Sequence, residues 1–239
     1  MEATTGSEAP PARGGEGLLL VDKPAGVTSH DMVIAARRAY GERSIGHLGT
    51  LDPFATGLLV LLLGRSTRLA TFIDTDPKIY DATIRFGTET DTDDSTGAVV
   101  RTAPEPDPQS VSDAIAALTG TILQAPPAYS AKSVDGERAY DAARRGEPME
   151  LAPASVTIHE WLVREQHRDR ISATITCGSG TYIRALARDL GRATGSAAHL
   201  ESLRRTRCGQ FDVRDAASLE DLRSSPPRLR RLLVVSSDA

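Results

Sequence analysis

An uninterrupted apolar run from Leu58 to Leu63 constrains the fold of this chain most strongly, because it directly follows a loop framed by glycines. A short apolar run bounded by turn residues is typical of a strand buried on both faces. The loop, residues 46–57, carries one carboxylate, Asp52, immediately before Pro53. Glycines allow tight turns and a buried strand would hold the loop rigidly, which favours a presented functional side chain. An Asp-Pro pair alone also fits a turn aspartate that bonds its own backbone, so other segments must decide.

The length of 239 residues and the apolar content of 40% suit one large domain, which we place at residues 17–213. We expect residues 1–16 to be a disordered tail and residues 214–239 a short C-terminal tail. Cys177 and Cys208 are isolated in the sequence, which indicates neither a disulfide framework nor a zinc site. No segment has the ~18 apolar residues of a membrane span or the apolar core of a signal peptide. We therefore expect a cytoplasmic protein that uses neither a membrane nor a metal.

Charge is distributed unevenly, although the formal net charge is only −4. Residues 88–108 are rich in acidic side chains, whereas residues 181–207 are rich in arginine, and such a local basic patch can bind a polyanion despite a negative total. The stretch from Asp91 to Gly97 superficially resembles a calcium loop. Its glycine comes one place late, however, and Thr102 stands where a bidentate Glu is needed. We therefore predict a solvated hairpin turn.

The hydrophobic pattern predicts an α+β domain around a mixed, largely antiparallel sheet flanked by helices. Residues 78–86 alternate cleanly as a half-buried strand, and Tyr80, which heads their apolar row, also fits an ordinary core tyrosine. Two prolines impose an extended path on residues 124–132, which could line a groove. The other expected strands are residues 17–22, 58–63, 156–163, 170–177 and 210–213. The expected helices are residues 29–40, 67–73, 111–118, 137–145 and a helix from 183, with a further amphipathic piece at 198–203.

A glycine-rich turn, residues 178–181, opens the helix expected at Ile183. Helix N-termini favour anions, and Arg184 and Arg188, spaced i and i+4, would strengthen that preference. An ordinary surface helix with solvated arginines explains the same pattern.

Six segments follow one another between roughly residues 17 and 213: residues 21–29 (VDKPAGVTS), 46–57 (GHLGTLDPFATG), 78–80 (KIY), 126–131 (PPAYSA), 180–184 (GTYIR) and 203–206 (LRRT). Taken together and in this order, they resemble the TruB-type tRNA pseudouridine-55 synthases.

This resemblance implies the pseudouridine synthase fold, with an active site in a cleft that crosses the sheet. It also implies conversion of a uridine in the tRNA T loop to pseudouridine, without a cofactor. We expect the protein to be a monomer. Asp52 falls on the family's catalytic aspartate, Tyr80 on the tyrosine that stacks on the target base, and Arg184 on the arginine that pairs with the aspartate. The expected substrate-binding residues are Leu203 in the uracil pocket, His47 in the space left by the flipped nucleotide, Tyr182, and Lys23 near the active site.

The chemistry of this reaction requires such residue types. A carboxylate can attack ribose C1′ or uracil C6 and later depart, and the sequence leaves these two routes open. It must be ionised, so a partly desolvated Asp52 needs a cation such as Arg184. A base that leaves its stack needs apolar and aromatic walls. A tyrosine could also deprotonate C5, although free tyrosine, with a pKa near ~10, is a poor base.

Two other functions fit parts of the sequence. A tRNA-binding or folding factor without catalysis would need the basic patches but not Asp52. Hydrolysis through an aspartyl intermediate would need a second carboxylate near the first, and the motifs contain no evident partner. TruB-type proteins commonly continue into a C-terminal PUA or similar RNA-binding module, and the residues after Arg207 are too few for one. We therefore expect a short C-terminal form.

Overall fold

The computed structural model describes residues 15–130, 133–134, 137–138, 145 and 151–230. The chain divides into two compact units. Unit 1 comprises residues 1–74 and 213–239, and unit 2 comprises residues 75–212. Nearly all of the expected N-terminal tail, and the end of the expected C-terminal tail, lie outside the described residues.

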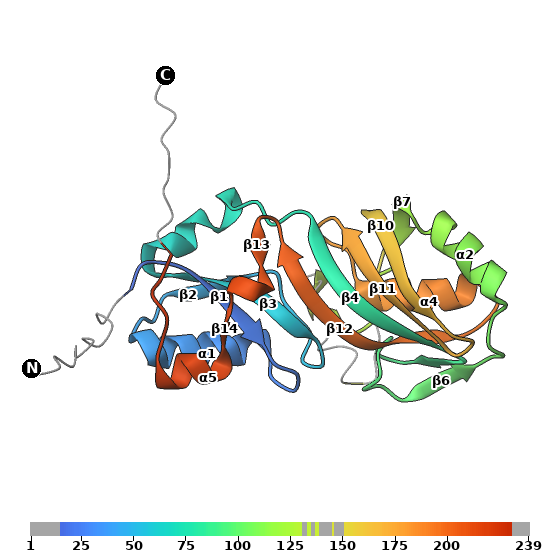
Figure 1. The fold of residues 1–239 in the computed structure, drawn as a ribbon, viewed down its shortest axis with the longest axis horizontal. Coiled ribbons are helices and arrows are strands. Elements are labelled where there is room, and N and C mark those ends of the chain that lie inside the picture. The colour runs from blue at the N-terminus through green and yellow to red at the C-terminus, as the bar shows by residue number, and fades with distance from the viewer. Residues whose placement is uncertain (1–14, 131–132, 135–136, 139–144, 146–150, 231–239) are drawn as a thin grey trace, which may run out of the picture. The chain divides into compact units, whose positions relative to one another are not determined.

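Unit 1 is built on strand β3 (Thr56–Leu63), the apolar run that the sequence singles out (Figure 1). The run is fully buried and pairs antiparallel with β1 (Gly17–Lys23) and with β2 (Ile45–Leu48). The expected loop at 46–57 therefore begins within a short strand, since residues 45–48 form backbone hydrogen bonds with β3. A 3₁₀ helix, η1 (Gly64–Phe72), follows β3 where a short helix was expected.

Helix α1 (Ser29–Tyr40) forms where the sequence predicts a helix, with an N-cap at Thr28 and one buried face. The Thr28 hydroxyl accepts from the Asp31 amide while the Asp31 carboxylate accepts from the Thr28 amide, a capping box that satisfies two terminal donors. Met32, Ala36 and other apolar side chains of one face are buried, and the helix ends at Gly41, whose φ is 64°.

The chain returns to unit 1 at its C-terminal end. There η2 (Val213–Asp215), β14 (Ala217–Ser218) and α5 (Leu219–Ser224) follow one another. β14 pairs in parallel with β1, and α5 packs on α1. Residues 213–224, most of which we assigned to a tail, thus add ordered elements to this unit.

Unit 2 is a sheet in the order β12-β4-β11-β10-β7, with each neighbouring pair antiparallel (Figure 1). The strands are β12 (Ala198–Cys208), β4 (Lys78–Phe86), β11 (Arg170–Cys177), β10 (Ala154–Gln166) and β7 (Gly120–Gln124), and β13 (Phe211–Asp212) pairs with β12. The hairpin of β5 (Thr88–Thr90) and β6 (Val99–Thr102) follows β4, and helices α2 (Pro108–Ala117) and α4 (Ile183–Ala193) complete the unit. Together with the parallel pair in unit 1, these strands confirm the predicted α+β fold with a mixed, mostly antiparallel sheet.

Most predicted elements of unit 2 are confirmed, and two predictions need comment. Residues 198–203, expected as a separate amphipathic piece, continue through 208 as strand β12, because β4 supplies their backbone partners. The helix expected at 137–145 lies largely outside the described residues, and its first two residues form β9 (Glu137–Arg138) opposite β8 (Ser133–Val134). No helix among the described residues is long and apolar enough to cross a membrane.

Candidate active-site residues

The Asp52 loop is held in unit 1 by backbone contacts on both sides of the carboxylate. The Ser29 hydroxyl bonds the backbone of Leu51, accepting from its amide at 2.9 Å and lying 3.1 Å from its carbonyl oxygen. On the other side, the Gly26 amide donates to the Pro53 carbonyl at 2.8 Å, and the Ala55 amide donates to the Asp52 carbonyl at 3.1 Å. Gly26 has φ 82°, which a residue with a side chain adopts only with strain. The backbone around Asp52 is therefore fixed by its neighbours.

Lys23 ties two loops of unit 1 together from inside. Its ammonium donates to the carbonyls of Pro24, Val27 and Pro53 at 3.0, 2.8 and 3.3 Å, and the residue is 0% exposed. Burying a charge is costly unless it is hydrogen-bonded, and three carbonyl acceptors offset that cost. Lys23 thus supports the loop that carries Asp52. His47 lies in β2 opposite Leu61 of β3 and is partly exposed.

Tyr80 and Leu203 lie on neighbouring strands of unit 2 and share one face of the sheet. Leu203 of β12 is directly opposite Ala82 of β4, and Arg205 is directly opposite Tyr80. Directly opposed residues point to the same face, and Tyr80 and Ala82 do so because they are two apart. The structure therefore brings the aromatic and aliphatic site candidates together in unit 2.

Burial raises the pKa of Tyr80 to about 12, although the adjacent Arg205 guanidinium opposes the shift. Arg205 is itself only 1% exposed. A phenol with this pKa stays protonated at neutral pH, so it can donate a hydrogen bond and is a poor proton acceptor. Sequence reasoning did not single out Arg205, and its place in an arginine-rich run gave no signal of its burial.

The start of helix α4 is fixed by Gln124 at the end of β7. Its side-chain oxygen accepts from the Tyr182 amide at 2.8 Å, and its side-chain nitrogen donates to the Tyr182 carbonyl at 3.2 Å. Tyr182 occupies the N-cap position, where the terminal amides have no partner within the helix. Gln124 thus fixes the residue at which α4 begins, and hence the position of Arg184 in its first turn.

Arg184 is buried and reaches two separate segments of unit 2. Nη1 donates to the Thr92 carbonyl at 2.8 Å, Nη2 donates to the Tyr129 carbonyl at 2.9 Å, and Nε lies 3.8 Å from a carboxylate oxygen of Asp94. Arg188, one turn further along, is also buried. The alternative reading, a helix with solvated arginines, is therefore wrong, because both guanidinium groups fold inward onto carbonyl and carboxylate oxygens.

The hairpin turn at residues 91–97 also differs from its prediction. Asp93 and Asp94 are buried, and their carboxylates pair with Arg188 and Arg184. Asp94 accepts in addition from Thr92 and Thr96, so the acidic turn folds inward and is not solvated. Two adjacent acids in a short turn, together with two arginines spaced i and i+4, were the sequence features that could have predicted these ion pairs. From the sequence, we instead interpreted the acids as a solvated turn and the arginines as an anion-binding helix start.

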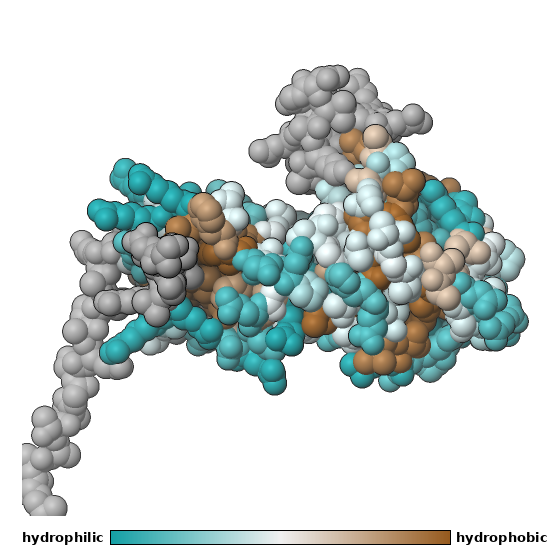
Figure 2. Space-filling model, turned by 90° about the horizontal axis from the view of Figure 1, so that it is seen from above, coloured by the Kyte–Doolittle hydropathy of each residue, from teal (hydrophilic) through white to brown (hydrophobic). Residues whose placement is uncertain are grey.

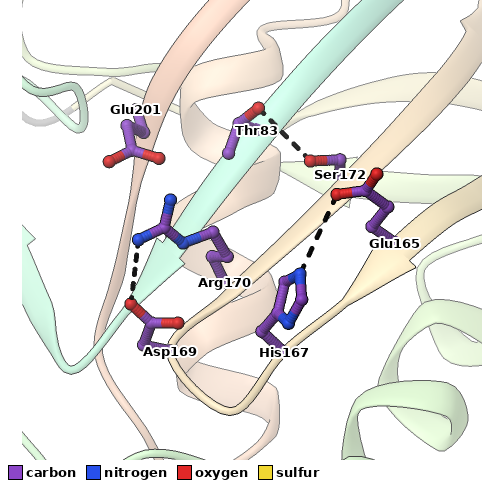
Figure 3. A pocket seen from close by; sticks show the side chains of 7 residues that line it. All are labelled: Thr83, Glu165, His167, Asp169, Arg170, Ser172 and Glu201. Carbon is purple, nitrogen blue, oxygen red and sulfur yellow. Dashed lines mark hydrogen bonds and ion pairs between the residues drawn. The ribbon is translucent and has the colours of Figure 1, made fainter.

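The molecule also has a polar depression in unit 2 away from these residues (Figure 3). It is lined by Thr83, Glu165, His167, Asp169, Arg170, Ser172 and Glu201. Thr83 points to the face of β4 opposite Tyr80, since the two residues are three apart on the strand. Arg170 is paired with Asp169 at 3.2 Å, and the three carboxylates in the lining would repel a polyanion. None of the predicted site residues lines this depression.

Some hydrophobic side chains are exposed on the surface. The face shown in Figure 2 carries hydrophobic patches bordered by hydrophilic ones. The large apolar side chains that are exposed in the described part of the chain are Phe72, Val99, Val100, Leu123, Leu162 and Val163.

The predicted site residues thus fall into two sets. Lys23, His47 and Asp52 belong to unit 1, and Tyr80, Tyr182, Arg184 and Leu203 belong to unit 2. Within each unit, the structure shows buried polar contacts that fix the backbone or the side chains around these residues.

Comparisons with known proteins identify related sequences over nearly the whole chain. Residues 37–183 match the model of the TruB family pseudouridylate synthase N-terminal domain, and residues 184–234 match that of the tRNA pseudouridylate synthase B C-terminal domain. The chain is 48% identical over 217 residues to tRNA pseudouridine synthase B of Thermobifida fusca, covering 87% of this chain and 74% of the relative. It is 50% identical over 222 residues to tRNA pseudouridine synthase B of Rhodococcus jostii, covering 89% and 72%.

Solved structures share the fold. The chain superposes on a chain of a Cbf5-Nop10-Gar1 complex with a TM-score of 0.65 and 26% identity, covering 86% of this chain and 53% of that one. A structure of an H/ACA RNP bound to a substrate RNA containing 2′-deoxyuridine matches with a TM-score of 0.62 and 23% identity, covering 90% and 58%. The chain thus spans a little over half the length of these solved chains.

Proposed function

Because the chain belongs to the TruB family of pseudouridylate synthases, we propose that it converts a uridine in the T loop of tRNA, at position 55, to pseudouridine. The observation that carries this proposal is the 48% identity to a tRNA pseudouridine synthase B over most of the chain. The reaction breaks the C1′–N1 bond and joins C1′ to C5 of the same ring, while C5 loses one proton and N1 takes one up. Product and substrate are isomers, so the proposed reaction consumes no oxidant, reductant or group donor.

We propose Asp52 as the catalytic carboxylate. It would bond to ribose C1′ or uracil C6 while the glycosidic bond breaks, and it would depart when C5 takes the place of N1. Both routes need an ionised carboxylate held at one place. The contacts on Leu51 and Pro53 support this role, because they fix the backbone on either side of Asp52.

We propose Arg184 as the cation that offsets the cost of an ionised, partly desolvated Asp52. Its support is a buried guanidinium held by carbonyl oxygens from two segments, which fixes where the positive charge lies. A preorganised charge stabilises a developing anion more than a mobile one, because no reorganisation accompanies the reaction.

The remaining residues would receive the flipped nucleotide. Tyr80 would stack on the uracil and Leu203 would form an apolar wall of the pocket, which their shared sheet face supports. His47 would occupy the space that the base leaves, Tyr182 would contact the substrate, and Lys23 would hold the Asp52 loop. Since the phenol of Tyr80 is protonated at neutral pH, another acceptor, such as the departing carboxylate or water, would take the C5 proton.

The partner in this proposal is the T stem-loop of tRNA, and a monomer suffices for the chemistry. The substrate would place the protein in the cytoplasm. Basic residues between 184 and 207 that are not fully buried would contribute phosphate contacts.

Tritium release tests the proposal. A T-arm RNA labelled at C5 of its uridines should lose tritium in the presence of wild-type protein, and mass spectrometry should locate pseudouridine at position 55. Asp52→Asn, which keeps the size of the side chain, should bind the same RNA and release no tritium. Binding by wild type without release would instead identify a tRNA-binding or folding factor. Turnover by Asp52→Asn would remove Asp52 from its role.

A further inference from the structure

The acidic turn between β5 and β6 is joined to helix α4 by two arginines one helical turn apart. Arg184 reaches the Thr92 carbonyl and the Asp94 carboxylate, as described above. Arg188 donates from Nη1 to Asp93 Oδ2 at 2.8 Å, and both side chains are less than a tenth exposed. Arg188 therefore anchors Asp93, which lies in the chain between Thr92 and Asp94, the two residues of the turn that contact Arg184.

Arg188 also anchors the second segment that Arg184 uses. Its Nη2 donates to the Ala125 carbonyl at 2.8 Å, four residues before Tyr129, whose carbonyl accepts from Arg184. Prolines 126 and 127 lie between these two carbonyls and restrict the path that connects them. The Arg188 guanidinium thus binds both of the segments whose carbonyls bind Arg184.

The backbone of the turn depends on this contact. Asp93 has φ 59°, a left-handed conformation that is uncommon for residues other than glycine, although Asp and Asn tolerate it best. This conformation lets consecutive side chains leave the turn in different directions, so that Asp93 reaches Arg188 while Asp94 lies beside Arg184. The buried ion pair on Asp93 compensates for the strained backbone.

We propose that Arg188 and Asp93 are positioning residues for Arg184, and that their ion pair sets the place of the Arg184 guanidinium in the reaction. This inference rests on the proposed function, because it assigns Arg184 a role in that reaction. From the sequence, Arg188 was considered only as a residue that would attract an anion, and Asp93 was not a site candidate. The ion pair acts through the Thr92 and Tyr129 carbonyls and does not itself touch substrate.

A matched control lies one turn further along the same helix. Arg192 pairs with Glu89 of β5, which also accepts from Arg101 of β6. Glu89 is as buried as Asp93, and its ion pair joins the same helix to the same hairpin. It does not contact the carbonyls that hold Arg184. Replacing either carboxylate by its amide therefore removes one buried charge, and only one of the two changes should affect Arg184.

The decisive experiment compares Asp93→Asn and Glu89→Gln by initial rates of tritium release at varied concentrations of T-arm RNA. Asparagine tolerates the left-handed conformation, so Asp93→Asn keeps the turn and removes the charge. We expect Asp93→Asn to lower kcat roughly 10- to 100-fold, because small displacements of a catalytic group cost that much, while KM changes little. Glu89→Gln should keep a kcat close to wild type. Equal losses in the two variants, or no loss in Asp93→Asn, would overturn the proposal.

The pH dependence adds a readout that a purely structural role would not move. Burial raises the pKa of Asp93 to about 6, even though Arg188 and Arg184 oppose the shift. As pH falls through this value, the wild type should lose the ion pair and its kcat should approach that of Asp93→Asn. The charged or titratable groups around Asp93 are Arg184, Arg188, Asp189 and Arg192 on α4, Glu89 on β5, Asp91 and Asp94 in the turn, and His199 on β12. All of these groups remain in Asp93→Asn, so the ratio of the wild-type kcat to the Asp93→Asn kcat reports the titration of Asp93 alone. A ratio that does not change between pH 5 and pH 8 would contradict the role.

Two further measurements keep the test decisive. Arg188→Lys should recover part of the activity that Arg188→Met loses, since lysine can still pair with Asp93 but cannot also reach Ala125. The Nε–H resonance of Arg184 in an NMR spectrum reports its position without any turnover. It should shift in Asp93→Asn and not in Glu89→Gln. If wild type releases no tritium, the proposed function fails, and this resonance alone decides whether Arg188 and Asp93 position Arg184.

Discussion

Lys23 and Pro53, thirty residues apart in the chain, are joined by a hydrogen bond of 3.3 Å from the ammonium nitrogen to the carbonyl oxygen. Pro53 directly follows Asp52, and the same ammonium also bonds the carbonyls of Pro24 and Val27. One buried cation therefore sets the spacing between the turn after β1 and the Asp52 loop. A family resemblance could name this lysine but could not say which oxygens it binds.

Replacing Lys23 by Met should therefore impair both stability and turnover. Methionine has a similar length but no donor, so three carbonyls would lose the charged partner that the buried Lys23 side chain supplies. We expect the free energy of unfolding to fall by about 2–4 kcal/mol. Urea denaturation measures this loss, and single-turnover tritium release at a temperature where the variant is folded measures the effect on the loop. Arg65→Met, a change at an exposed cation of η1, serves as the control and should leave the urea midpoint unchanged. A midpoint for Lys23→Met equal to that of the control would contradict the anchoring role.

Arg184→Lys should abolish most of the activity while the protein stays folded. A lysine retains the positive charge but cannot place one donor on the Thr92 carbonyl and another on the Tyr129 carbonyl in the fixed fork of a guanidinium. The positive charge would therefore be displaced, and because a small misplacement of a catalytic group can cost about a hundredfold, we expect kcat to fall by roughly that factor. Rapid-quench kinetics with saturating RNA would measure it. Turnover near the wild-type rate would show that charge alone suffices.

Local patterns were sufficient to predict most elements of this fold. Strict alternation placed the strand at 78–86, and a continuous apolar run placed the strand at 58–63, because side-chain periodicity is a local property. Strand β2 and the full length of β12 were missed, since their formation depends on β3 and β4, which lie elsewhere in the sequence. Short strands with mixed composition gain their stability from a partner that no local pattern reveals.

The candidate site shows the same division between local and distant information. The family motifs supplied Asp52, Tyr80 and Arg184, and the packing around these three residues came only from the structure. The acidic turn illustrates the reason. A carboxylate in a polar turn is usually solvated, and only the burial of α4 against this turn converts Asp93 and Asp94 into ion-pair partners. Which charges meet is decided by tertiary packing.

Tyr80→Phe should change how stability depends on alkaline pH. The pKa of Tyr80 is raised to about 12 in the folded state, above the value near 10 of an unfolded tyrosine, because burial disfavours the phenolate. The folded state therefore keeps its proton where the unfolded state releases it. The resulting penalty on folding is absent below pH 10 and grows as pH rises from 10 to 12.

Phenylalanine at this position cannot ionise, so the variant should lose less stability over that range. The difference between the two proteins should reach about 2 kcal/mol at pH 12, at roughly 1.4 kcal/mol for each pKa unit. Tyr40, whose pKa is also raised to about 12, contributes equally to both proteins. Urea denaturation between pH 9 and pH 12 measures the difference. Parallel curves for wild type and variant would show that Tyr80 is not desolvated.

Gly191→Ala should destabilise unit 2 strongly, because helix α4 packs at this position directly on the backbone that leads into β12. A Cβ at residue 191 would lie 2.4 Å from the Ala198 nitrogen and 2.8 Å from the Ala197 carbonyl carbon, and backbone atoms cannot move aside as a flexible side chain can. Alanine normally favours a helix over glycine by ~1 kcal/mol, so helix propensity alone predicts stabilisation. Overpacking outweighs that gain, and we expect a net loss of about 1–3 kcal/mol in the free energy of unfolding. Gly46→Ala in β2 is the matched control, since a Cβ there meets no atom within 4 Å. A urea midpoint for Gly191→Ala at or above that of wild type would show that α4 does not approach β12 this closely.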